Sequence, residues 1–153
     1  MKGITIAVFS HFIGHPATKD ELRSITDDQI AAIYKRNYWD VVRGDEMPTP
    51  IDYMVFDFAV NAGNNRCGKT LQHAVGVPPD GIIGPMTLAA VNAANPHALI
   101  DKFSQSKCDF YVQLRNFATF GRGWMNRVEH VKANALAMLA DGFGDVVAGI
   151  DRA

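Results

Sequence analysis

One segment constrains the fold of this chain more than any other. Residues 51–62 (Ile-Asp-Tyr-Met-Val-Phe-Asp-Phe-Ala-Val-Asn-Ala) carry almost no polar face. At helical periodicity this run predicts a helix that is apolar nearly all round, and such a helix lies at the centre of a fold. Gly63 is its expected end. The rest of the chain must therefore supply helices that cover this one.

Turn-forming residues divide the remainder into such helices. Gly14 and Pro16 end a first amphipathic segment in which Ile6, Phe9, Phe12 and Ile13 share one face. A capping box, Thr26 to Gln29, opens a second helix that we expect to run to about Val42. Further helices are predicted over 66–75, 85–94, 96–117 (the longest) and 124–139, with a turn at Gly121 and Gly123 before the last. The sequence predicts an all-α fold, a single domain of about seven helices.

Composition and charge limit the kinds of binding partner that this chain can have. The chain has 153 residues, 48% hydrophobic and 20% charged, which is typical of one soluble globular domain. Its formal net charge is −1 and no basic run is present, so we expect no nucleic-acid partner. No stretch reaches the roughly 20 apolar residues of a membrane span, so we expect no membrane insertion.

Three further patterns bear on compartment and chemistry. The apolar N-terminus is short and His11 interrupts it, so we expect no signal peptide and a chain that accumulates in the cytoplasm. Cys67 and Cys108 form no CxxC pair; two reduced thiols are the favoured interpretation, and a disulfide between them stays open. The histidines lack metal-ligand spacing, and no phosphate-binding, dinucleotide or nucleophile-elbow motif occurs. We therefore predict neither a metal nor a cofactor.

Four motifs, in order along the chain, resemble one family, the phage and prophage N-acetylmuramidases of glycoside hydrolase family 108. They are Tyr38-Trp39-Asp40 with Arg43-Gly44-Asp45; residues 55–63; Leu71-Gln72 to Gly76 followed by residues 80–88; and residues 120–127. The resemblance implies a lysozyme-like helical fold and an endolysin that cuts cell-wall peptidoglycan. It also implies a peptidoglycan-binding portion from about Tyr53 onward.

The chain departs from the family at its beginning. Family members open with a helix ending in Glu-Gly-Gly, whose glutamate is the expected general acid, and a Gly-rich loop then leads into Gly-Ile-Thr. Here Met1-Lys2 is followed directly by Gly3-Ile4-Thr5. We therefore expect 1–50 to be a remnant of the muramidase N-terminal lobe, 51–140 a peptidoglycan-binding helical region and 141–153 a weakly structured tail. Together they are expected to form one compact domain.

Glycoside hydrolysis needs a protonated carboxylic acid near the leaving oxygen. Asp57 lies inside the apolar helix, so it is either a cleft residue or a structural carboxylate bonded to the backbone, Arg43 or Arg127; the structural role is favoured. Glu46 is a weaker candidate. The resemblance points to Thr5 as a residue that positions water, although a helix N-cap is favoured for it. The catalytic residue thus stays unknown.

The sequence also offers residues for sugar binding. Tyr38 and Trp39 are aromatic side chains of the kind that pack against sugar rings, and a core role is equally open to them. Asn61 lies one helical turn beyond Asp57, so both occupy one face, as sugar ligands or as a buried polar network. We take Tyr38, Trp39, Asp57 and Asn61 as the candidate substrate-binding set.

Three functions follow as alternatives. The favoured one is a muramidase-type protein that binds peptidoglycan glycan strands, is catalytically impaired, and reaches the wall after release from the cytoplasm. The others are a non-catalytic wall-binding or regulatory protein and a phage structural or secretion-associated protein. Loss of an N-terminal helix would expose apolar surface, so we expect either a homodimer or modest stability.

Overall fold

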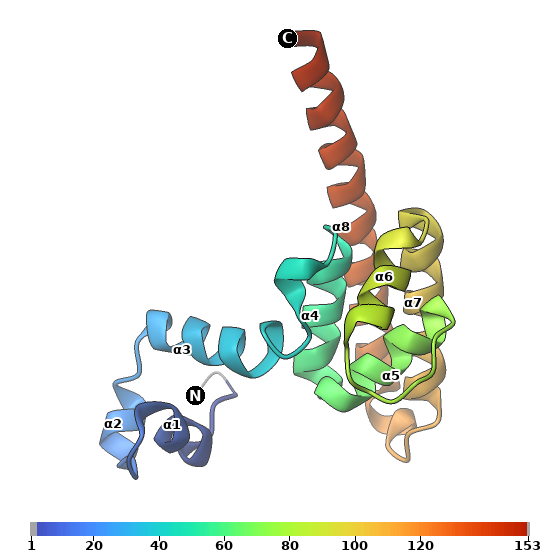
Figure 1. Ribbon diagram of the computed structural model, residues 1–153. Coiled ribbons are helices and arrows are strands. Elements are labelled where there is room, and N and C mark those ends of the chain that lie inside the picture. Colours follow the sequence, from blue (N-terminus) through green and yellow to red (C-terminus); the bar gives the residue numbers. More distant parts are fainter. Residues whose placement is uncertain (1–2, 153) are drawn as a thin grey trace.

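The computed structural model describes the backbone of residues 3–152 and the side chains of residues 3–141 (Figure 1). It confirms the all-α, lysozyme-like prediction, with no strand among the described residues. The described part contains eight α-helices, a five-residue π-helix and a short 3₁₀ helix. In chain order they are α1 Ile6–Ile13, α2 Lys19–Arg23, α3 Asp27–Tyr34, η1 Lys35–Trp39 (π), η2 Gly44–Glu46 (3₁₀), α4 Ile51–Ala62, α5 Asn64–Val75, α6 Pro85–Ala93, α7 Pro96–Val112 and α8 Phe117–Arg152.

Helix α4 is the central helix that the sequence predicts. Met54, Val55, Phe58 and Ala59 are each 0–1% exposed. They belong to a large core to which α5, α6, α7 and α8 all contribute. The closest packing is between α7 and α8, α5 and α7, and α4 and α5. We call this part, α4 to α8, the body.

The first three helices form a second, smaller unit, which we call the lobe. Its own core consists of Ile4, Phe9 and Ile33, with half-buried neighbours from α1, α2 and α3 around them. Figure 1 shows α1 and α2 standing off to one side, with α3 and η1 leading from them to α4. The chain thus builds two hydrophobic clusters, joined through η1.

The predicted caps are confirmed, whereas several predicted helix ends are wrong. Thr26 and Gln29 form the capping box of α3. However, α3 stops at Tyr34, and the π-helix η1, with its bond from Asp40 N to Lys35 O (2.8 Å), replaces the predicted run to Val42. Helix α2 was not predicted, although Thr18 and Glu21 form a second capping box there.

The C-terminal boundaries also differ from the prediction. Helix α7 ends at Val112, and α8 begins at Phe117, so α8 is the longest helix and extends beyond the predicted end at Leu139. Gly121 and Gly123 lie inside α8, where a turn was expected. A Cβ at Gly121 would come 2.5 Å from the Phe117 ring, so glycine is needed here for packing and not for a turn.

Most of the third family motif forms a hydrogen-bond network around Gln72. The amide of Gln72, 1% exposed, donates to Asp80 Oδ1 (2.8 Å), Ile82 O (3.0 Å) and Thr87 Oγ1 (3.1 Å), and its oxygen accepts from Gly81 N (2.8 Å). Hydrogen bonds from the Ile82 backbone and then from Gln72 lower the pKa of Asp80. The pattern therefore ties the loop between α5 and α6 to α5.

Among the described residues, no helical segment combines the length and the apolar character that a membrane span requires.

Candidate functional site

A polar pair joins α4 to α8. Arg127 Nη2 donates to Asp57 Oδ1, and the Asn61 amide donates to Asp57 O (3.0 Å) and Oδ2 (3.4 Å). The Asp57 side chain is 11% exposed and that of Arg127 is 59% exposed. The structure therefore places Asp57 and Asn61 together, as the helical spacing predicts, with Asp57 held by Arg127.

Aromatic side chains continue this surface along α8. Trp124 stacks on Tyr111 at 5.0 Å between ring centroids, and Phe120, 53% exposed, lies 5.8 Å from Trp124. Positions 120, 124 and 127 recur at helical spacing, so they share one face of α8. We call the surface formed by Asp57, Asn61, Phe120, Trp124 and Arg127 the α4–α8 face. Exposed rings beside hydrogen-bonding groups are typical of saccharide sites.

Trp39 packs against a neighbouring face of α4. Its indole Nε1 donates to Asp45 Oδ1 (2.9 Å), and its ring meets Phe56 edge-on at 5.7 Å. Gly44 lies directly beneath the ring, where a Cβ would come within 2.5 Å of it. Trp39 thus reaches α4 at the residue preceding Asp57, on a neighbouring face of the helix.

Tyr38 points back toward the lobe. Its ring stacks on Tyr34 at 5.8 Å, and it also packs against the edge of the body core. Asn64 Nδ2 donates to Asn37 O (2.8 Å) and so attaches η1 to the start of α5. Tyr38 is therefore part of the junction between lobe and body.

The weaker catalytic candidates are engaged elsewhere. Arg43 donates to both oxygens of Glu46, at 2.5 and 2.7 Å, and this bonding raises the pKa of Arg43. Thr5 accepts from Val8 N (3.2 Å) as the N-cap of α1, in agreement with the favoured sequence interpretation. The structure brings neither residue to the α4–α8 face.

Two comparisons identify the family. The model for glycosyl hydrolase 108 matches residues 1–63, and a model for a predicted peptidoglycan domain matches residues 66–129. The structure of SagA from Brucella abortus is similar over 89% of this chain and 78% of that chain, with 39% identity and a TM-score of 0.79. The chain belongs to the glycosyl hydrolase 108 family. The comparison with curated proteins finds no match.

The boundary between the two matched regions of this glycosyl hydrolase 108 protein falls where α4 passes into α5. Asp57 and Asn61 lie in the first region, and Phe120, Trp124 and Arg127 lie in the second. The α4–α8 face is therefore made by both regions together. Membership of this family places the chain among proteins that bind and hydrolyse cell-wall peptidoglycan and that resemble the phage muramidases.

A buried amine lies behind the face of this glycosyl hydrolase 108 member. Lys107 is 2% exposed, with its Nζ 4.6 Å from the centre of the Phe103 ring and 5.5 Å from that of Phe58. Burial lowers the pKa of Lys107 to about 8, and the charge of Asp57 partly offsets this shift. The hydrogen bond to Asp57 raises the pKa of Arg127. Asp57 thus lies between an exposed and a buried cation.

Sequence reasoning found only part of this site. From the sequence, Arg127 is predicted only as a structural partner of Asp57, and Phe120 and Trp124 stand out only as members of a family motif. The 3.6-residue spacing of positions 120, 124 and 127 was a usable signal, but the expected turn at Gly121 and Gly123 concealed it. Among residues 3–141, no cluster of His, Cys, Asp or Glu has the arrangement of a metal site.

Proposed function

We propose that this chain binds the glycan strand of peptidoglycan across the α4–α8 face, and that these 153 residues by themselves do not cut it. The observation that carries the proposal is the Asp57–Arg127–Asn61 group beside the exposed ring of Phe120 and the half-buried ring of Trp124, in a member of the glycosyl hydrolase 108 family. Trp39, on the next face of α4, extends the surface toward the lobe.

The groups on this face match the chemistry of an N-acetylated sugar chain. Apolar ring faces of sugars pack on aromatic side chains such as Phe120, while hydroxyl and acetamido groups need donors and acceptors. Arg127 keeps exposed N–H groups beyond its bond to Asp57, and Asn61 is exposed. A glycan strand can therefore be held by stacking and by directed hydrogen bonds.

The same geometry argues against cleavage by these residues. A general acid must hold a proton and present it to the leaving oxygen. Asp57 is paired with Arg127 and Asn61, and both oxygens of Glu46 are occupied by Arg43. Protonation of the bridging oxygen by either would require breaking an ion pair first. A hydrolytic form of this site would take its acid from a segment outside these residues.

Binding is tested by sedimentation with purified sacculi. Phe120→Ala should weaken binding about tenfold, since an exposed stacking ring contributes on the order of 1–2 kcal/mol. Val112→Ala, which truncates a side chain with 52% exposure on α7, is the matched control and should bind normally. Failure of the unmodified chain to bind any wall preparation would refute the proposal.

Hydrolysis is tested separately by the release of reducing ends from the same sacculi. We expect no release by the 153-residue chain, and lysis by a version extended at its start with a Glu-Gly-Gly helix and its loop. Robust release by the chain alone would overturn the claim of impaired catalysis. Asp57→Asn and Glu46→Gln would then show which carboxylate acts.

The homodimer, which the sequence offers as an alternative to modest stability, remains a proposal. Ile6 and Val8 of α1 are 40% and 36% exposed, so the lobe presents apolar side chains that a second copy would cover. Light scattering should show a dimer that Ile6→Ser with Val8→Ser converts to monomers. A monomeric, highly stable unmodified chain would contradict this.

A further inference from the structure

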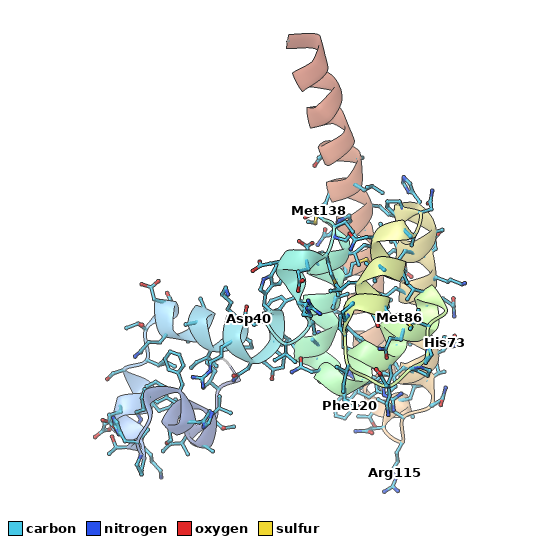
Figure 2. The ribbon with its side chains drawn as sticks, viewed as in Figure 1. Asp40, His73, Met86, Arg115, Phe120 and Met138 are labelled. Atoms are coloured by element: carbon cyan, nitrogen blue, oxygen red, sulfur yellow. The ribbon has the colours of Figure 1, made fainter. Side chains whose placement is uncertain are left out.

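A groove of about 650 Å³ lies between α5 and α7, outside the α4–α8 face. Each wall presents side chains at helical spacing, so each wall is one face of its helix. The residues that matter here are Arg66, Lys69 and His73 on α5, Asp109 and Phe110 on α7, and Gln113, which caps the end of α7. Figure 2 shows His73 on the opposite side of the body from Asp40, which follows η1. The groove and the η1 region thus lie on different sides of the molecule.

The α5 wall carries cations that have no anionic partner. Among residues 3–141, neither Arg66 nor Lys69 forms an ion pair. The Arg66 guanidinium lies 5.0 Å from the centre of the Phe110 ring, which is a cation–π contact. Its N–H groups remain available to a carboxylate, for which the guanidinium fork has matching geometry.

The α7 wall carries a carboxylate held in place. Gln105 Nε2 donates to Asp109 Oδ1 (2.9 Å), and Gln113 Nε2 donates to the Asp109 carbonyl (3.0 Å). One side of the groove is therefore cationic and the other anionic. A uniform polyanion such as a nucleic acid is disfavoured by Asp109, whereas a ligand that carries carboxylates and an amine matches both walls.

We propose that this groove binds the stem peptide of peptidoglycan. The stem carboxylates lie against Arg66 and Lys69, its free amine against Asp109, and its aliphatic part on Phe110. This inference rests on the proposed function, since it assigns a second contact to the same wall polymer. The α4–α8 face then contacts the sugars and the groove contacts the peptide. Intact peptidoglycan should bind more tightly than either part alone, because the second contact forms within the same complex.

The experiment compares intact sacculi with stripped glycan, the free glycan strands that remain after an amidase has removed the stem peptides. The test variant is Arg66→Gln with Lys69→Gln. The matched control is Lys19→Gln with Lys102→Gln, which likewise removes two cations, both of them exposed and without an ion pair among residues 3–141. We expect the test variant to lose about fivefold to tenfold in affinity for intact sacculi and to bind stripped glycan normally. The control should bind both normally.

A direct probe is the free tripeptide Ala–γ-Glu–diaminopimelate, with and without acetylated amines. Asp109→Asn should weaken binding of the free peptide and leave the acetylated one unaffected. An equal loss by the control variant, an equal loss on stripped glycan, or no binding of the tripeptide would overturn the stem-peptide assignment. In each case Phe120→Ala on stripped glycan still tests the glycan proposal on its own.

Discussion

The lobe and the body are built by the same means and differ in how much they bury. Among the described residues, the body core contains twenty buried side chains and the lobe core contains three. Both have well-capped helices: Thr5, Thr18 and Thr26 cap the lobe helices, and Asn95 caps α7 in the body. The quality of the helix caps therefore does not indicate how stable a unit is.

The difference shows which unit should carry most of the stability and which should open more easily. Burial scales with the apolar area removed from water, so the body carries most of the free energy of folding. The lobe depends on local capping and on its junction with the body through Tyr38 and Asn37. A unit of this kind opens at lower free energy than the part to which it is attached. The following predictions test that contrast.

The largest effect is expected from truncation of the central ring of the body. Phe58 contacts the rings of Phe103, Phe110 and Tyr111 at 5.8–5.9 Å between centroids. Phe58→Ala should lower the free energy of unfolding by about 3–5 kcal/mol, as judged by urea denaturation. Phe9→Ala in the lobe, a matched change at a 3% exposed site, should mainly accelerate hydrogen exchange in α1 and α3. Equal global losses would show one cooperative unit.

The next largest effect is expected from loss of the Gln72 hydrogen-bond network. Gln72→Leu keeps the volume but leaves the Gly81 N–H and the Ile82 carbonyl without their partner. Buried polar groups without partners are costly, so we expect a loss of about 2–4 kcal/mol by denaturation. Gln105→Leu, at an exposed site, should stay within about 0.5 kcal/mol. A neutral Gln72→Leu would mean that the loop is not tied to the body as described.

Removal of the buried amine should stabilise the body. Lys107→Met deletes a charge that burial disfavours and should raise the free energy of unfolding by about 1–3 kcal/mol at pH 7. The folded pKa of about 8 lies below the ordinary 10.5, so the unfolded chain holds the extra proton between these values. Lys107 should therefore make the stability of the unmodified protein rise with pH from about 8 to 9, whereas above pH 9 the buried Cys67 thiol, whose pKa burial raises to about 12, opposes this rise. A rise that persists in Lys107→Met would assign it to other groups.

The smallest effect is expected from removal of helix caps. This effect should stay local in the lobe but should be global in the body. Thr26→Ala removes a capping-box oxygen in the lobe, and Asn95→Ala removes the bond from Ala98 N (3.0 Å) in the body. Each costs about 1 kcal/mol locally. We expect Thr26→Ala to increase hydrogen exchange in α3 alone, whereas Asn95→Ala should shift the global unfolding midpoint. Global destabilisation by Thr26→Ala would weaken the contrast between the units.

Local signals predicted the elements well. The apolar run of α4, the Thr26–Gln29 capping box and the helix starts at Pro85 and Pro96 are properties of a few neighbouring residues, and all appear in the structure. Two local signals misled. Gly121 and Gly123 suggested a turn, but α8 needs Gly121 for the Phe117 ring, a contact that composition does not show. The π-helix η1 likewise interrupts a run that periodicity extends to Val42.

The candidate site also combines features that local sequence signals predict with features that they do not. The shared face of Asp57 and Asn61 follows from helical spacing alone, and so does the N-cap role of Thr5. The partner of Asp57 does not, because Arg127 lies 70 residues away and is brought to it only by the packing of α8 on α4. The groove between α5 and α7 depends equally on how two helices pack. The sequence determined most of the helices, several of their caps and the family resemblance, since these depend on short-range geometry. The tertiary structure alone decided which polar and aromatic groups meet across helices, because that depends on how the whole core is filled.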